Sequence, residues 1–160
     1  MTFNKTMLCS LIFVLSNPVL ALTFPYASYA TTTVDEICEL NTVDLHFGEL
    51  DFINKSGTFR VGGYVNIRCT QGTNYKLSVE TINKSTGTRY LISSTTPDKI
   101  EYNFYKKGTN QLFGDSGNND YLEGVGSGIF DRVDFDAKID SNQNIIPGNY
   151  RDTVTISVHY

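Results

Sequence analysis

The last fourteen residues, PGNYRDTVTISVHY at positions 147–160, decide the fold class. From Val154 onwards every second side chain is apolar, so that Val154, Ile156, Val158 and Tyr160 alternate with polar neighbours. A period of two places such a set on one face of a half-buried β-strand. We therefore predict a C-terminal strand whose apolar residues face a core and whose polar residues face the opposite side.

The same alternation recurs upstream of this terminal strand. The segments that show it are 43–47, 59–69, 75–79, 89–92 and 100–105. Gly62 and Gly63 suggest a bulge or bend within the second of them, and the Gly-, Asn- and Asp-rich stretch 114–128 is expected to be a long loop. Short strands separated by turn signals predict an antiparallel β-sandwich, and without an internal repeat we expect one such domain.

Length and charge bound the class of protein. A chain of 160 residues is about one domain. Its 13 basic and 17 acidic side chains give a formal net charge of −4, and its largest basic cluster is the pair Lys106 and Lys107. A sequence-independent nucleic-acid binder needs a basic face that displaces counterions from phosphates. We therefore expect no nucleic-acid partner.

The N-terminus has the features of an export signal. Lys5 precedes an apolar run over residues 8–15, which is the length of a signal-peptide core and too short to span a bilayer. Small-x-small cleavage sites end at Ala21 and, alternatively, at Ala30. We expect a signal peptide over residues 1–21, and no integral membrane segment in the mature protein because no second run of spanning length follows.

Cleavage would leave two cysteines, Cys38 and Cys69, in the mature chain. Paired cysteines in an exported protein normally form a disulfide. There is no CxxC redox motif, and two cysteines without suitably spaced histidines do not make a zinc site. We predict a structural disulfide between Cys38 and Cys69.

The sequence contains no arrangement typical of a catalytic centre. His46 and His159, the only histidines, stand at polar positions of alternating segments, where a solvent-facing side chain is expected. The Gly-x-Ser-x-Gly motif of hydrolases is absent, and Ser127 lies in the predicted loop rather than between a strand and a helix. We therefore expect no catalytic residues and no cofactor, and the protein is not expected to be an enzyme.

Carboxylates are frequent between positions 115 and 140, but they do not form a recognisable metal site. Residues 140–144 begin like a calcium-binding loop, yet Ile145 stands where its turn glycine is required and Arg151 where its bidentate glutamate is required. The remaining carboxylates are expected to form a solvated face, and they include Asp131, Asp134 and Asp136.

Four stretches carry a resemblance to a known family. They are VDLHFG at 43–48, VNIRCT followed by YKL at 65–77, IEYNFY at 100–105 and PGNYRDTVTISV at 147–158. The last is the most specific, because Gly148, Tyr150 and Asp152 form a Gly-x-Tyr-x-Asp motif that leads into an alternating terminal strand. The sequence resembles the spore coat protein U family, which includes subunits of archaic chaperone–usher pili, from Cys38 to Tyr160. LFGD at 112–115 is similar to the family's Trp-Gly-Asp turn, with Phe113 in place of the tryptophan.

This resemblance implies an immunoglobulin-like antiparallel β-sandwich that lacks its last strand. Such a domain would be completed by donor-strand complementation, in which another chain adds a strand to an open sheet edge. The implied partners are a periplasmic chaperone, an outer-membrane usher and other pilus subunits. The groove and chaperone-binding strand would then comprise Val154, Ile156, Val158 and Tyr160.

The implied function is a structural subunit of a secreted surface fibre, or fimbrium, that supports adhesion or biofilm formation. Its route would be export to the periplasm and then to the cell surface. Cleavage after Ala21 leaves residues 22–37 as an N-terminal extension and candidate donor strand, although Pro25 cannot donate a ladder hydrogen bond. Cleavage after Ala30 leaves only seven residues, which is too few. The alternative is a secreted, non-polymerising adhesin or carbohydrate-binding β-sandwich.

Overall fold

The computed structural model describes residues 28–42, 44–114 and 116–160. The predicted signal peptide lies outside the described residues, apart from its alternative end at Ala30. Residues 28–33 belong to a separate N-terminal unit and are exposed without regular secondary structure. Residues 34–160 form the other compact unit, which is the domain discussed below.

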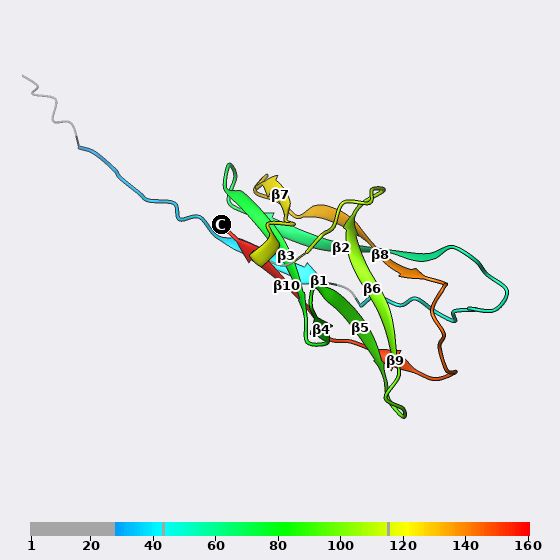
Figure 1. Ribbon diagram of the computed structural model, residues 1–160. Coiled ribbons are helices and arrows are strands. Elements are labelled where there is room, and N and C mark those ends of the chain that lie inside the picture. The colour runs from blue at the N-terminus through cyan, green and yellow to red at the C-terminus, as the bar shows by residue number, and fades with distance from the viewer. Residues whose placement is uncertain (1–27, 43, 115) are drawn as a thin grey trace, which may run out of the picture. The chain divides into compact units, whose positions relative to one another are not determined.

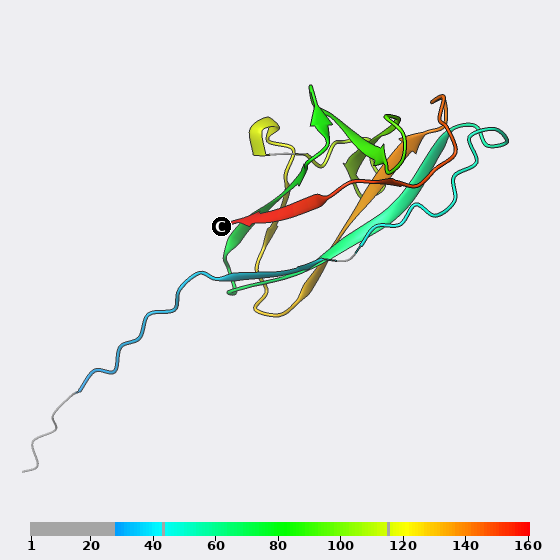
Figure 2. The same ribbon diagram turned by 90° about the horizontal axis from the view of Figure 1, so that it is seen from below.

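The described part of this domain consists of antiparallel strands and one short 3-10 turn, Ser116–Asn118 (Figures 1 and 2). The strands are β1 (Cys38–Thr42), β2 (Thr58–Cys69), β3 (Asn74–Thr81), β4 (Lys84–Ser85), β5 (Thr88–Ser93), β6 (Lys99–Lys106), β7 (Leu122–Val125), β8 (Asp131–Asp140), β9 (Tyr150–Arg151) and β10 (Val154–His159). The predicted all-β sandwich is confirmed, and no helix among the described residues is long and apolar enough to span a membrane.

Two sheets build the domain. The larger has seven strands in the order β1-β2-β8-β6-β5-β4, with β9 paired to β5, and the smaller has the order β10-β3-β7. Their inner faces enclose a core of aliphatic and aromatic side chains, in which three rings, Phe104, Phe113 and Phe135, meet edge to face at centroid distances of 5.4–6.5 Å. Such edge-to-face packing adds to the free energy gained from burial. Phe113 thus serves as the aromatic anchor expected from the family's turn motif.

The long strand β2 is regular throughout, and the bulge predicted at Gly62 and Gly63 is absent. Its ladder with β8 pairs residues one to one from Thr58–Asp140 to Ile67–Asp131. Gly63 has a steric purpose instead, since a Cβ at this position would lie 2.6 Å from the Phe135 ring and 2.7 Å from Leu45. A close side-chain approach, rather than a change of backbone course, therefore requires this glycine.

Two further expectations differ from the structure. The predicted loop 114–128 contains strand β7, which pairs with β3 from Leu77–Leu122 to Asn74–Val125. The solvated face predicted from Asp131, Asp134 and Asp136 is part of β8, which lies between β2 and β6 in the large sheet. Asp134 and Asp136 lie on its outward face, whereas Asp131 alternates in step with the core residues Phe135 and Ala137. Asp136 is itself buried, with 1% of its surface exposed.

Candidate functional site

Strand β10 lies at an edge of the small sheet. It pairs only with β3 within the described residues, in continuous antiparallel register from Val154–Thr81 to His159–Lys76. The backbone N–H and C=O groups along the other side of β10 have no strand partner there. An edge of this kind is a template on which a further strand can form.

The inner face of β10 is apolar, as predicted. Val154, Ile156 and Val158 pack against the core but are only half-buried, whereas Thr155 on the other face is exposed. Tyr160 differs from the prediction, because the strand ends at His159 and 59% of the Tyr160 surface is exposed. Its side chain instead lines a hollow of about 530 Å³ at the end of β10 and β3.

Strand β1 forms the facing edge of the large sheet. It pairs only with β2 among the described strands, and it contacts β10 of the small sheet. Leu40 on β1 is half-buried against the core. The two edge strands therefore lie next to each other, each with a backbone edge that no described strand pairs and with half-buried apolar side chains.

The segment that follows β1 adds further half-buried apolar side chains. The predicted strand 43–47 is absent from the described residues 44–47, which have no ladder partner. Their side chains nevertheless alternate, because Leu45 and Phe47 pack against the core while Asp44 and His46 are exposed. The alternation therefore predicts correctly which of these side chains face the core, but the prediction that the segment pairs as a strand is wrong. We call the half-buried apolar residues of β1, β10 and the segment 44–47 the apolar seam, which consists of Leu40, Leu45, Phe47, Val154, Ile156 and Val158.

The Gly-x-Tyr-x-Asp residues fix the start of β10. The Asp152 carboxylate accepts hydrogen bonds from the Tyr102 hydroxyl at 2.8 Å, from Asn83 Nδ2 at 2.7 Å and from the backbone N–H of Thr153 at 2.8 Å. Burial, followed by the bond to Asp152, raises the pKa of Tyr102. Asp152 therefore connects Thr153, the residue before β10, to Tyr102 on strand β6 and to Asn83 in the turn that follows β3.

The other two residues of the motif, Gly148 and Tyr150, come just before this point in the chain. The Tyr150 hydroxyl donates to the carbonyl of Ile146 at 2.6 Å, which closes the loop that precedes β9. A Cβ on Gly148 would make only ordinary contacts, 3.6 Å from Tyr150 and 3.7 Å from Ser93. Nothing in the structure explains why glycine occupies this position.

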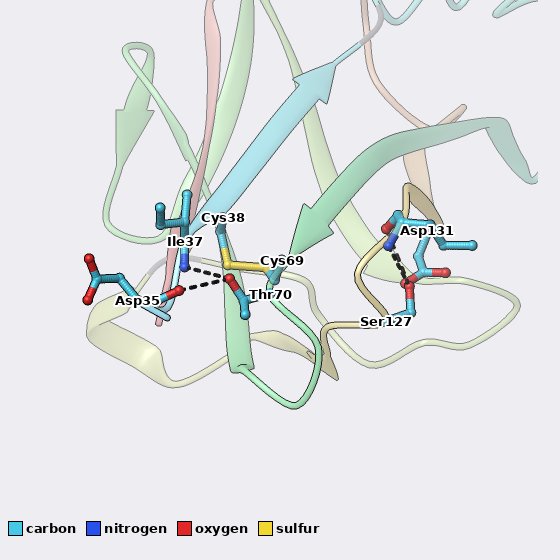
Figure 3. The surroundings of a disulfide bond; sticks show 8 residues. Asp35, Ile37, Cys38, Cys69, Thr70, Ser127 and Asp131 are labelled. Atoms are coloured by element: carbon cyan, nitrogen blue, oxygen red, sulfur yellow. Dashed lines mark hydrogen bonds between the residues drawn. A yellow bond between two sulfur atoms is a disulfide. The ribbon is translucent and has the colours of Figure 1, made fainter. Parts of the chain in front are cut away.

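The predicted disulfide between Cys38 and Cys69 is present (Figure 3). It joins the first residue of β1 to the last residue of β2, which are paired in the ladder. The adjacent Thr70 hydroxyl donates to the carbonyl of Asp35 at 3.0 Å and accepts from the N–H of Ile37 at 3.2 Å. The backbone N–H of Thr70 donates to the Ile37 carbonyl at 3.0 Å. The edge strand is therefore anchored at its first residue and for three residues before it.

A buried carboxylate lies on the other side of the large sheet. Asp136 accepts hydrogen bonds from Lys107 Nζ at 2.9 Å, from the Gly108 N–H at 2.9 Å and from Arg60 at 3.3 Å. Burial alone would raise the pKa of Asp136, but the bonds from Gly108 and Lys107, together with the nearby charge of Arg60, hold it below its ordinary value of 3.8. The prediction of a solvated carboxylate is wrong here, and the group instead fastens the turn after β6 to the sheet.

The histidines and Ser127 do not form a common site. His46 is exposed on the segment after β1, and His159 Nε2 lies 2.9 Å from the Ser78 hydroxyl on the small sheet. Ser127 donates to the Asp131 carboxylate at 2.5 Å within its own loop. In the part of the chain that the structure describes, no group of three or more His, Cys, Asp or Glu side chains is placed to hold a metal ion.

Comparison with known proteins identifies the family. The family model of the Spore Coat Protein U domain matches residues 26–157. The chain belongs to the Spore Coat Protein U domain family. The match starts within the predicted N-terminal extension and ends two residues before the end of β10. A comparison with curated protein sequences finds no match.

Solved structures show the same fold. This chain is similar, with a TM-score of 0.61 and 25% identity, to a chain in the crystal structure of the CsuC–CsuE chaperone–tip adhesion subunit pre-assembly complex from the archaic chaperone–usher Csu pili of Acinetobacter baumannii. That match covers 80% of this chain and 41% of the other, so this chain spans less than half the length of that relative. The P pilus rod subunit PapA has a TM-score of 0.56 at 12% identity, covering 77% of this chain and 98% of PapA.

Proposed function

We propose that this protein is an exported subunit of a surface fibre that a chaperone–usher system assembles through donor-strand exchange. The observation that carries the proposal is the open edge of β10 beside the apolar seam, in a chain that belongs to the Spore Coat Protein U domain family. A strand added there would pair the free backbone groups of β10 and cover the half-buried side chains on both sheets.

The proposed sequence of partners follows from the chemistry of this edge. An open apolar seam in the periplasm needs a temporary cover, which a chaperone strand would supply, as a chaperone accompanies the subunit in the related Csu complex. At an outer-membrane usher, the N-terminal extension of another subunit would then replace it. Residues 28–37 of this chain are exposed and outside any strand, as a donor segment must be before exchange.

The proposal includes export and a non-enzymatic role. A signal peptide over residues 1–21 would deliver residues 22–37 as the extension and 38–160 as the sandwich domain, first to the periplasm and then to the cell surface. The family and fold are those of structural pilus subunits. Adhesion and biofilm formation would follow from the fibre rather than from turnover of a substrate.

The test is expression of the full chain in the periplasm with and without its cognate chaperone. Together they should give a soluble one-to-one complex, and the chain alone should aggregate or be degraded because its apolar seam stays open. Mixing purified complexes with usher should then give polymers. N-terminal sequencing of the product would locate the cleavage site. A stable soluble monomer without chaperone would instead support the non-polymerising adhesin or carbohydrate-binding module.

A further inference from the structure

The N-terminal extension is attached to the domain without a free linker. Thr70 binds residues 35–37 through three hydrogen bonds of 3.0–3.2 Å. Figure 3 shows the two that its hydroxyl makes, together with the disulfide that follows immediately. These bonds continue the pairing of β1 with β2 beyond the strand itself. Residues 35–37, the last of the expected extension, are therefore fixed to the domain.

A loop lies against the same anchor. The Gly72 N–H donates to the Gly126 carbonyl at 2.9 Å, the Gly126 N–H to the Thr73 carbonyl at 2.8 Å, and the Gly128 N–H to the Cys69 carbonyl at 3.1 Å. A Cβ on Gly126 would lie 2.5 Å from the Thr70 carbonyl oxygen, so only glycine permits this approach. The loop and the anchored start of the extension are thus parts of one hydrogen-bonded structure.

This loop presents apolar side chains to solvent. Its tip is ordered by Ser127, whose hydroxyl donates to Asp131 and accepts from the N–H of Ile129 at 3.4 Å. Ile129 is 68% exposed, and Phe130 is 43% exposed with the Arg68 guanidinium 4.7 Å from its ring centroid. We use the name root patch for four exposed apolar residues on the segments that meet at the anchor, namely Ile37, Val125, Ile129 and Phe130.

We propose that the root patch is a contact surface for the neighbouring subunit, namely the one whose β10 edge receives this chain's extension. The inference rests on the proposed function and adds a second, non-strand contact to it. Because residues 35–37 are bound to the domain, only residues up to Val34 can pair with the acceptor. The β10 edge of the acceptor must therefore lie close to Val34. The acceptor's domain is then brought against this end of the sandwich, where exposed apolar side chains gain free energy by losing contact with water.

The position of the patch favours a subunit over any other occupant. The patch is continuous with the segment that enters the acceptor, so its partner is present in every donor–acceptor pair. Ile53 provides the comparison, because it is 92% exposed but lies in the connection between β1 and β2, at the other end of these strands from the disulfide. A head-to-tail joint pairs the root patch with a different surface of the acceptor, so a probe at Ile53 should not reach the domain that receives this chain's extension.

Photo-crosslinking in polymers of the full chain tests this contact. Benzoylphenylalanine would replace Phe130 in one preparation and Ile53 in another, each purified with the chaperone and assembled in the same way. We expect adducts from position 130 that map to the domain receiving this chain's extension, and no adduct from position 53 to that same domain. Adding Ile129→Asp to the position 130 probe should abolish the adduct while polymer yield and the disulfide are unchanged.

The possible results separate the two proposals. Polymers that form normally but give no adduct at position 130, or equal adducts to that domain at both positions, would overturn the root patch as a joint and leave the fibre function standing. An adduct insensitive to Ile129→Asp would also overturn it. Absence of polymers from the parent chain would overturn the fibre function, and the joint with it.

Discussion

Asp136 shows what a single buried charge does in this domain. With 1% of its surface exposed, its carboxylate is held by Lys107, Arg60 and the N–H of Gly108. Removing one member of a buried, hydrogen-bonded ion pair leaves the other members without compensation. This residue therefore fixes the turn after β6 to β8, and its loss is expected to be felt in the stability of the whole sheet.

We predict that Asp136→Asn lowers the free energy of unfolding by about 2–3 kcal/mol, because Lys107 and Arg60 are partly exposed and the full cost of a buried pair is not reached. Asp134→Asn is the matched control, since its ion pair with Arg132 lies at the surface and should contribute about 0–1 kcal/mol. Urea unfolding of the chaperone-free domain bound to a donor peptide, or of the chaperone complex, measures both. Equal losses would contradict this role for Asp136.

The same contact predicts a dependence on pH. The pKa of Asp136 in the folded protein lies below 3.8, the ordinary value that applies to the unfolded chain. Its contribution is therefore complete above that value and is lost as the pH falls through the folded pKa. The stability difference between the parent and Asp136→Asn should be full at about pH 6 and should shrink progressively below about pH 4. A difference that stays constant on acidification would show that the charge is not responsible.

The pair of Tyr102 and Asp152 gives a second prediction at this scale. Replacing Asp152 by Ala leaves the buried Tyr102 hydroxyl without its acceptor, at a cost of about 1–3 kcal/mol. Tyr102→Phe removes the donor and should cost less, and the double variant should recover part of the loss. The measurement is a double-mutant cycle in urea. Strict additivity of the two substitutions would mean that the hydrogen bond does not hold the start of β10.

At the scale of elements, the terminal strand offers the most direct test of the open edge. Ile156→Asp would place a carboxylate among the half-buried side chains of the apolar seam, costing several kcal/mol unless it is protonated or paired, and chaperone capture should fail. Thr155→Asp is the matched control, because Thr155 is exposed on the other face of the same strand. A pull-down with the chaperone at equal expression compares them. Equal capture would remove β10 as the acceptor strand.

How far the elements can be predicted from sequence depends on their surroundings. The regular alternation of β10 and β2 survives because one face of each strand meets the core and the other faces solvent or polar cover. In strand β8 the alternation does not predict burial, because the polar residues Asp136 and Lys138 on its outward face are buried beneath the turn after β6. A carboxylate that is buried through contacts 28 or more residues away in sequence gives no local signal.

The candidate site was only partly visible in the sequence for a similar reason. The apolar face of β10 could be predicted, and the disulfide followed from export and from the number of cysteines. The contribution of Leu45 and Phe47 to the apolar seam depends on tertiary packing of a segment that forms no ladder. Thr70 binds the backbone of Asp35, and Gly126 lies against the backbone of Thr70. The residue types at these two positions do not predict such contacts.

At the scale of the whole molecule, the disulfide connects the site to the rest of the domain. Cys38 and Cys69 are 31 residues apart, so their bond should stabilise the domain by about 3–4 kcal/mol through the restricted unfolded chain. We predict that Cys38→Ser with Cys69→Ser lowers the unfolding free energy of the chaperone complex by an amount of this order. In the parent protein, mass spectrometry without reduction should find no thiol that can be alkylated. Two free thiols in the exported parent would contradict the prediction.

The same bond also determines how a fibre of such subunits would carry tension. A pull on Val34 is directed along the start of β1, which is antiparallel to β2, and it would open their hydrogen bonds one after another from the Cys38 end. The covalent bond closes that end, so the force crosses the two sulfur atoms and enters β2 at Cys69. From there it is spread along the uninterrupted ladder with β8, where many bonds resist together. The edge strand that must stay open for assembly is thereby protected from being peeled away under load.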